Sequence, residues 1–267
     1  MDHDPFAELK QRQRRMWASF APTALFTTPV AGHLVRFAGI APGESVLDVG
    51  TGTGVVAITA ARAGARVAAL DLTPALLEQA RRDAAVAQCA DIAWTEGDAE
   101  QLPYPDAAFD VVLSQFGHMF APRPEVAIAE MRRVLKPGGR IAFATWPPEH
   151  LVGRMFMFVA RNSPPPPPGA QPPAQWGAPS VVATRLEAGF HAPFFERGTM
   201  HFPALSPAHY RQFMEQAVGP MQMLVESAAA DPPRLHALRQ EFEALCAPYL
   251  QDNVMRSDYL MTRARAR

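Results

Sequence analysis

The sequence has little cysteine, almost no net charge and no long apolar run, and each shortage removes a class of protein. Cys89 and Cys246 are its only two cysteines, which disfavours a disulfide framework and a cysteine zinc site. A formal charge of −1 excludes the broad positive field of proteins that coat nucleic acid. No apolar stretch approaches the roughly 20 residues that span a bilayer, and the start Met1-Asp2-His3-Asp4 is acidic where a secretion signal is basic. We therefore expect a soluble, cytoplasmic protein.

Proline, by contrast, is abundant, and its distribution divides the chain. Many of the 27 prolines gather around the unbroken run Pro164–Pro168, which cannot form a helix interior or a central strand. Before this run, apolar segments alternate in a strand–helix rhythm. After it, the sequence favours helices rich in methionine and aromatic residues. We predict a proline-rich loop over residues 151–180.

The first forty residues favour helices. Asp4 can cap a first helix, and Phe6, Leu9, Met16 and Trp17 fall at spacings compatible with one apolar face. A second helix is predicted around residues 28–38. The basic residues of the first helix are expected mainly on its solvated side, and they are Lys10, Arg12, Arg14 and Arg15.

Five short apolar runs predict strands, at residues 46–49, 67–70, 92–94, 109–114 and 141–146. Helical patterns separate them, for example residues 55–63 and the helix that Thr73 and Pro74 begin. Buried strands that alternate with helices form a parallel sheet covered on both faces. Ligands bind such sheets at the carboxyl ends of the strands, so we expect a site around Gly50, Asp71, Asp98 and Ser114.

A glycine-rich turn after the first strand favours a bound nucleoside. The segment Val46-Leu-Asp-Val-Gly-Thr-Gly-Thr-Gly54 runs from a strand through three glycines into a helix, whose amino terminus attracts anions. The third glycine comes one residue too early for the dinucleotide fingerprint, which disfavours a nicotinamide cofactor. Asp71 can accept from both ribose hydroxyls, and Asp98 from an exocyclic adenine amine.

Together these segments resemble the class I S-adenosylmethionine-dependent methyltransferases. The resemblance is carried by residues 46–54, by Asp71-Leu72-Thr73, by Glu96-Gly97-Asp98-Ala99 and by the Lys136-Pro-Gly-Gly139 turn. Residues 98–110 are similar to the branch with the ubiquinone and menaquinone biosynthesis methyltransferases. The resemblance implies an α/β fold, with a Rossmann-like, seven-stranded, mostly parallel sheet and helices on both faces. Residues 194–202 and 259–265 would form the antiparallel last pair, and residues 204–255 a helical cap between them.

The resemblance also implies S-adenosylmethionine as cofactor and a set of contacts. The three glycines would approach its methionine part, and Asp48 would either order the glycine loop or meet the amino group. Leu72 and Ala99 would lie beside the adenine. Ser114 and Gln115 would line the methyl-donor end. The predicted cofactor residues are therefore Asp48, Gly50, Gly52, Gly54, Asp71, Leu72, Asp98, Ala99, Ser114 and Gln115.

Methyl transfer from a sulfonium needs positioning and exclusion of water, and a base only if the acceptor must lose a proton. His118 follows the fourth strand and is the candidate base, although it could equally be a wall of the pocket. The predicted acceptor pocket is partly apolar, and its residues are Trp17, Phe20, Met119, Phe120 and Trp176. No histidine pair has metal-ligand spacing, so no metal is predicted.

We thus predict one domain over residues 1–267 that methylates a small, partly hydrophobic molecule by direct in-line transfer. Residues 1–40 would lie over the site, and residues 41–150 would form the cofactor-binding core. Two alternatives stay open: a nicotinamide-dependent oxidoreductase, or a nucleotide-binding relative without catalysis. A basic-arm contact with RNA is disfavoured as the main role. The acceptor atom and the oligomeric state stay open as well.

Overall fold

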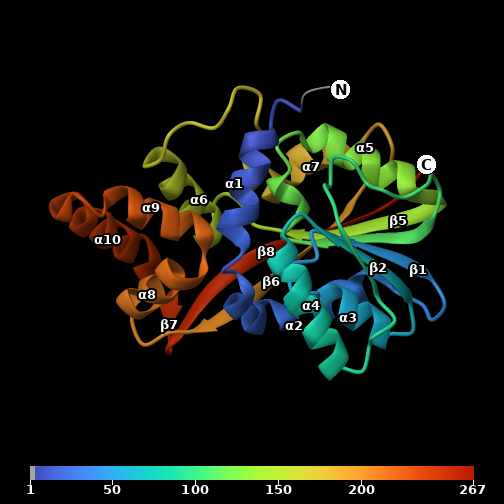
Figure 1. Cartoon of the computed structure of the whole chain (residues 1–267), viewed down its shortest axis with the longest axis horizontal. Helices are drawn as coiled ribbons and strands as arrows, with labels where there is room; N and C mark the ends of the chain where they lie inside the picture. Colours follow the sequence, from blue (N-terminus) through green and yellow to red (C-terminus); the bar gives the residue numbers. More distant parts are fainter. Residues whose placement is uncertain (1–3) are drawn as a thin grey trace.

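The computed structural model describes residues 4–267. Eight strands form one sheet, and helices pack on both of its faces (Figure 1). The strands are β1 Ser45–Val49, β2 Arg66–Asp71, β3 Ala93–Glu96, β4 Phe109–Gln115, β5 Leu135–Thr145, β6 Phe194–Pro203, β7 Leu250–Gln251 and β8 Val254–Arg265. The α-helices are α1 Ala7–Trp17, α2 Ala24–Ala38, α3 Val55–Arg62, α4 Pro74–Val86, α5 Pro124–Val134, α6 Leu151–Arg161, α7 Pro179–Leu186, α8 Pro207–Ala217, α9 Gly219–Ala228 and α10 Pro232–Cys246. The short 3-10 turns are η1 Ala21–Thr23, η2 His118–Phe120, η3 Pro173–Gly177 and η4 Ala247–Tyr249.

The strand order is β3-β2-β1-β4-β5-β8-β6. Strands β1 to β5 pair in parallel, whereas β8 runs antiparallel to both β5 and β6. Seven strands on this path confirm the predicted Rossmann-like sheet and its antiparallel last pair. The eighth strand, β7, is a two-residue addition that pairs only with β8.

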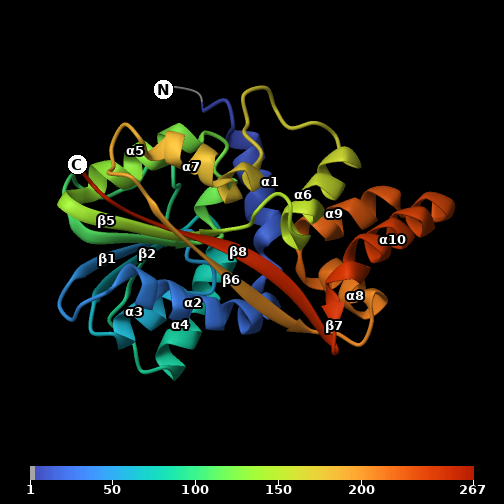
Figure 2. The same ribbon diagram turned by 180° about the vertical axis from the view of Figure 1, so that it is seen from behind.

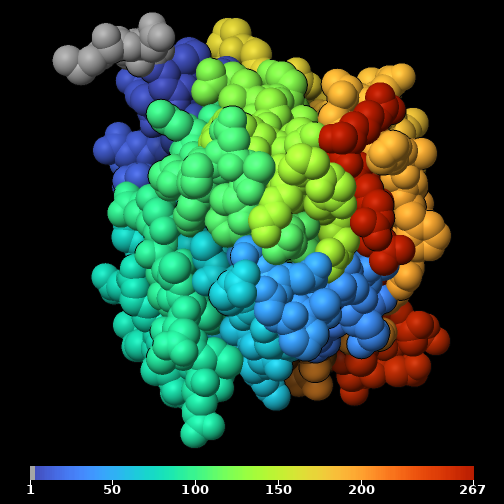
Figure 3. All heavy atoms as spheres, turned by 90° about the vertical axis from the view of Figure 1, so that its right-hand side faces the viewer, coloured from blue at the N-terminus to red at the C-terminus, as the bar shows by residue number. Residues whose placement is uncertain are grey.

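The central strands are apolar because both of their faces are covered. Every residue of β1 after Ser45 is buried, and so are residues 111–114 of β4. Helices α2, α3 and α4 cover one face, and α5 and α7 the other (Figures 1 and 2). Seen from the side, residues near the C-terminus run between the β5 region and the β6–α7 region (Figure 3), as the position of β8 in the sheet requires.

Several predicted boundaries need correction. Residues 136–139 do not leave the strand as a turn, because β5 already begins at Leu135 and absorbs them at a shift in its register with β4. Strand β8 begins at Val254 rather than at 259. The loop predicted over 151–180 begins with a helix, α6, whose Leu151, Met155 and Phe158 are buried. Only residues from the end of α6 to η3 are irregular, and these include the proline run.

The segment between β6 and β8 carries helices α8, α9 and α10, as predicted for an insertion there. These three helices form a group to one side of the molecule, and α1 lies between this group and α4 (Figure 1). Helix α1 packs against α9, and α8 packs against η1. Within residues 4–267, no helix has both the length and the apolar character needed to cross a membrane.

Candidate functional site

The glycine loop that joins β1 to α3 is shaped by close backbone contacts. Gly50, Gly52 and Gly54 all have positive φ angles of 66°, 56° and 81°, which glycine adopts without steric cost. A Cβ on Gly50 would lie 2.8 Å from the Cα of Gly117, so the loop and the chain after β4 touch through bare backbone. The amides of Gly50 and Thr51 both donate to the carbonyl of Leu70, at 2.8 and 3.0 Å. The loop is therefore fixed in position by the end of β2 and by the chain that follows β4.

Gly54 has a different role from its two neighbours. It does not line the cavity beside the loop, although it was predicted to approach the cofactor. A Cβ there would lie 2.7 Å from the indole of Trp94 and 3.1 Å from Ala80. Gly54 thus allows α3 to begin where β3 and α4 pack against it.

Asp48 lies beneath the loop and is almost completely buried. Its Oδ2 accepts from the Thr51 hydroxyl at 2.6 Å and from the Ala57 amide at 3.1 Å. Its Oδ1 is buried, lacks a hydrogen-bond partner and belongs to a residue that lines the cavity. Burial raises the pKa of Asp48 to about 7. One oxygen therefore orders the loop, and the other keeps unused hydrogen-bond acceptor capacity.

The raised pKa of Asp48 has a consequence for stability. Between about pH 4 and 7 the folded state holds a proton on this carboxyl, whereas the unfolded state has already released it. The contribution of Asp48 to the free energy of unfolding therefore falls as the pH rises through that window. Asn does not titrate, so we expect the stability of Asp48→Asn relative to the native chain to rise by about 2 kcal/mol when the pH is raised from 5 to 6.5, since one pKa unit is worth about 1.4 kcal/mol. Urea unfolding of both proteins at these two pH values measures the difference. A difference independent of pH would contradict the assignment.

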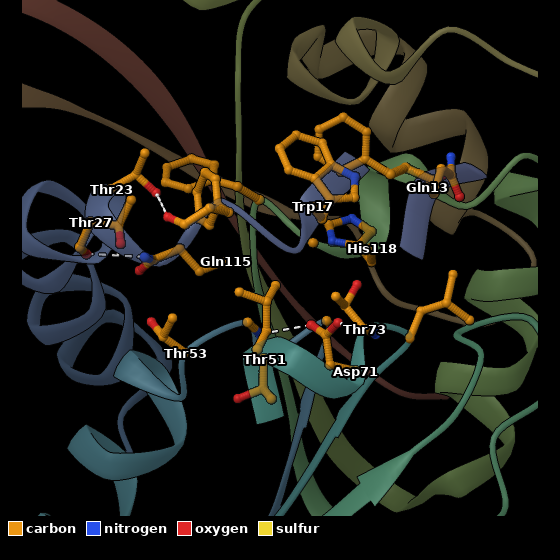
Figure 4. Close-up of a pocket in the computed structure, with 18 of the residues that line it drawn as sticks. Gln13, Trp17, Thr23, Thr27, Thr51, Thr53, Asp71, Thr73, Gln115 and His118 are labelled. Carbon is orange, nitrogen blue, oxygen red and sulfur yellow. Dashed lines mark hydrogen bonds between the residues drawn. The ribbon is translucent and has the colours of Figure 1, made fainter. Parts of the chain in front are cut away.

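Asp71 ends β2 and faces the cavity from the other side of the loop (Figure 4). Its Oδ2 accepts from the Gly52 amide at 2.7 Å, and its Oδ1 accepts from the Thr73 amide at 2.8 Å. The side chain is 8% exposed, and burial raises its pKa. Each oxygen keeps a free lone pair, so the carboxylate ties the loop to the start of α4 and can still accept from a ligand. Leu72 lines the cavity beside it.

Asp98 and Ala99 also line the cavity, but Asp98 is already engaged by a lysine. Its Oδ1 accepts from the Glu100 amide at 2.8 Å, and its Oδ2 lies 2.6 Å from Nζ of Lys10. Lys10 was expected on the solvated face of the first helix, and this prediction is wrong, since the residue is 7% exposed. Its Nζ also lies 2.7 Å from both Asp4 and Glu100. The helical period was right, but spacing could not show that Asp98 and Glu100, two of the three partners of Lys10, lie after β3.

The residues after β4 separate into two kinds. Ser114 was predicted at the methyl-donor end, but it does not line the cavity, because its hydroxyl donates to the Val49 carbonyl at 2.6 Å and accepts from the His118 amide. Gln115 does line the cavity. Its Nε2 donates to the Thr27 carbonyl at 3.0 Å, while its buried Oε1 has no partner.

His118 lines the cavity with a ring that is 1% exposed. Its ring packs 4.6 Å from the rings of both Phe143 and Trp176, and neither ring nitrogen has a hydrogen-bond partner. Burial and the nearby Arg185 charge lower its pKa to about 3. Within residues 4–267 no hydrogen bond orients this imidazole, and its affinity for a proton is low, so the site disfavours His118 as a base.

The aromatic residues predicted for the acceptor pocket also separate. Trp17, Phe20 and Phe120 line the cavity, and Trp17 packs against both phenylalanines. Met119 and Trp176 do not line it. Both are core residues, and the Trp176 ring is covered by His118, Phe143 and Arg185. Sequence reasoning missed a group of lining residues from α2, β6 and α8 and the segments beside them, namely Thr23, Phe26, Thr27, Met200, Phe202, Tyr210 and Phe213.

Comparisons with known proteins agree with this geometry. Residues 47–143 match a family described as methyltransferase domain. An uncharacterized protein of Mycobacterium tuberculosis is 36% identical over 94% of this chain and 93% of its own length. The demethylmenaquinone methyltransferase of Renibacterium salmoninarum is 40% identical over 42% of this chain and 45% of its own. A structure of a putative methyltransferase from Bacillus halodurans shares the fold, with a TM-score of 0.62 and 23% identity over 88% of this chain and 97% of the other.

The chain belongs to the class I S-adenosylmethionine-dependent methyltransferases. The family match decides against the nicotinamide alternative, and S-adenosylmethionine is the methyl donor of this family. The residues present fit that cofactor. The loop lines the cavity with Gly50 and Gly52, and a Cβ on Gly52 would meet no atom within 4 Å. Asp48 has an unpartnered buried oxygen, and Asp71 lines the same cavity.

Proposed function

We propose that this enzyme transfers a methyl group in line from S-adenosylmethionine to a small, partly hydrophobic acceptor. The observation that carries the proposal is a single cavity that joins the loop and acid residues to a largely apolar wall. Bound S-adenosylmethionine supplies an already activated methyl group on a sulfonium. The protein therefore needs mainly to hold two molecules in register and keep water away.

The binding roles follow from the geometry on each side of the loop. Gly50 and Gly52 would admit the methionine part, with the free Oδ1 of Asp48 accepting from its amino group. Asp71 would accept from the ribose hydroxyls, and Leu72 and Ala99 would pack near the adenine. Asp98 would accept from the adenine amine through a second lone pair, since Lys10 and the Glu100 amide use the first pair on each oxygen.

Water would be excluded by segments outside residues 41–150. Residues 1–40 supply Gln13, Trp17 and Phe20 to the cavity, and the segment 204–255 supplies Tyr210, Phe213 and Met214. Two hydrogen bonds hold α1 and the residues just after it over the site: the Gln13 amide donates to the Phe120 carbonyl at 3.0 Å, and Ser19, beyond the end of α1, donates to Gln222 of α9 at 2.8 Å. We propose that both segments work with residues 41–150 as one domain and close over the reactants.

Calorimetry with S-adenosylmethionine and with NAD tests the cofactor, and only the former is expected to bind. A labelled-methyl screen over quinol, phenol and amine acceptors then tests the transfer. Labelled product from at least one neutral acceptor is expected. Binding of NAD in place of S-adenosylmethionine would overturn the proposal, and tight cofactor binding without transfer across a broad acceptor set would favour a non-catalytic relative.

We expect His118→Leu to retain most of the methyl-transfer rate at pH 7, because an unoriented imidazole with a pKa of about 3 is a poor base. The substitution should also reduce acid sensitivity. The unfolded chain binds a proton on His118 below about pH 6.5, and the folded chain does not. The free energy of unfolding of the native protein therefore falls as the pH falls below about 6.5. The native chain should lose about 2 kcal/mol relative to the variant between pH 6.5 and 5. Turnover and urea unfolding at both pH values test it, and loss of turnover with unchanged cofactor affinity would restore His118 as the base.

A further inference from the structure

The part of the cavity away from Asp71 has its own chemistry. We call it the acceptor chamber and define it by six lining residues, Thr23, Phe26, Thr27, Gln115, Phe202 and Phe213. Thr23, Thr27 and Gln115 gather on one side of the glycine loop, and Asp71 and Thr73 lie on the other (Figure 4). The rings of Phe26, Phe202 and Phe213 pack on one another, with centroids 3.9 to 5.5 Å apart. The chamber thus presents an aromatic wall with a few polar atoms.

Among residues 4–267, no charged side chain belongs to the chamber. The charged residues that line the whole cavity are Lys10, Asp48, Asp71 and Asp98, and these belong to the loop, the strand ends and α1. Tyr210 borders the chamber, and burial raises its pKa, so its phenol stays neutral. A carboxylate, phosphate or ammonium group placed there would lose its hydration without gaining a partner of opposite charge, which is costly. The chamber therefore favours an uncharged molecule.

The hydrogen-bonding groups of the chamber are unevenly satisfied. Thr23 donates its hydroxyl proton to the Phe20 carbonyl at 2.6 Å, and Thr27 donates to the Ala24 carbonyl at 3.2 Å. The orientation of the Gln115 amide is fixed as well, because the Thr27 carbonyl that it meets can only accept, so Nε2 must be the atom that faces it. The donors of these three side chains are thereby directed to backbone carbonyls. What remains is acceptor capacity, above all the buried and unpartnered Oε1 of Gln115.

We propose that the methyl acceptor is an uncharged, ring-bearing molecule whose O–H or N–H group donates a hydrogen bond to Oε1 of Gln115. This proposal rests on the proposed function and names the substrate class for the same site. It makes Gln115 a positioning residue that the Thr27 carbonyl holds in one orientation. A buried amide oxygen that stays unpaired with the wrong ligand penalises that ligand, which is how such a group selects for a donor. The proposal concerns the binding of the acceptor and adds no proton-transfer step.

The test uses the protein loaded with S-adenosylhomocysteine and three probes of one shape: 1-naphthol, 1-methoxynaphthalene and 1-naphthoate. Calorimetry or ligand-detected NMR gives their affinities. We expect 1-naphthol to bind at least about tenfold more tightly than the other two, since only it is a neutral donor. Equal affinity for naphthol and its methyl ether, or a preference for naphthoate, would overturn the proposal.

Gln115→Leu removes the amide and should abolish the preference for naphthol over methoxynaphthalene. Gln251→Leu, an exposed position in β7, makes the same chemical change away from the cavity and should leave the preference intact. Retention of the preference in Gln115→Leu would assign it to another group and refute the role of Gln115. Should Gln115→Leu not fold, the three-probe comparison on the native protein still decides the substrate class.

Two different failures can be told apart. If the protein does not bind S-adenosylmethionine, the proposed function fails, whatever the three probes do. If the cofactor binds and methyl transfer occurs but the probes show no preference for the neutral donor, only the substrate class is wrong.

Discussion

Replacing Asp71 with alanine is expected to weaken S-adenosylmethionine binding at least about a hundredfold. The bound cofactor would lose two hydrogen bonds from its ribose hydroxyls to the Asp71 carboxylate. Hydrogen bonds to a charged acceptor contribute about 1.5–3 kcal/mol each. The same change removes the acceptor of the Gly52 amide, which lies 2.7 Å from Oδ2, and of the Thr73 amide. The loop that must admit the methionine part would thus lose a support at the same time. Isothermal calorimetry with S-adenosylmethionine measures the loss.

Two further variants separate charge from a general effect of substitution. Asp71→Asn keeps one oxygen for the Gly52 or Thr73 amide but loses the charge, and we expect an intermediate loss of about tenfold. Asp91→Ala removes an exposed carboxylate just before β3 and should leave the affinity unchanged. Near-native affinity in Asp71→Ala, with the variant shown to be folded, would remove the ribose contact from the proposed binding mode.

The sheet could be predicted from the sequence because its strands are buried on both faces. Runs such as Val46–Val49 and Val111–Leu113 are continuously apolar, and glycine or an acid marks their carboxyl ends. The outer strands were harder to place. The first part of β8 pairs only with β6 and the short β7. Its buried Met255 and Ser257 alternate with less buried positions, so this part lacks the continuous apolar signal of a buried strand. The Lys136–Gly139 segment carries a turn composition, yet it lies inside β5, between the pairs Leu135–Phe109 and Arg140–Val111 and at the register shift with β4.

The cofactor side of the site was predictable where a motif lies next to a strand end. Gly50, Asp48, Asp71 and Asp98 all follow this rule, and all line the cavity. Phe202 and Phe213 come from β6 and α8, far along the chain, and nothing in their spacing distinguishes a cavity wall from ordinary core. Trp176 illustrates the reverse error, because an aromatic residue after a proline-rich loop suggests a pocket but packs over Phe143 and His118 instead.

The buried position of Lys10 leads to the second large expected effect, which concerns the attachment of α1. Its Nζ lies 2.6–2.7 Å from Asp4, Asp98 and Glu100, and the Glu100 side chain is 1% exposed. Burial works against the lysine charge, but the hydrogen bonds to these carboxylates outweigh it and raise the pKa of Lys10. We expect Lys10→Met to lower the free energy of unfolding by about 3 kcal/mol, because it removes a buried counter-charge from the buried Glu100 and from the partly buried Asp4 and Asp98.

The effect should also be local to the first helix. Arg123 still pairs with Glu100 at 2.6 Å, so the core beneath keeps part of its compensation, whereas α1 loses its central ionic contact. We therefore expect limited proteolysis to cut within residues 4–20 faster in Lys10→Met, before global unfolding. Arg14→Met is the matched control on the same helix, since Arg14 and Glu96 form an ion pair 2.6 Å apart with side chains 40% and 45% exposed. Such a pair contributes at most about 1 kcal/mol, so equal losses of stability in the two variants would show that burial does not set the strength of the Lys10 cluster.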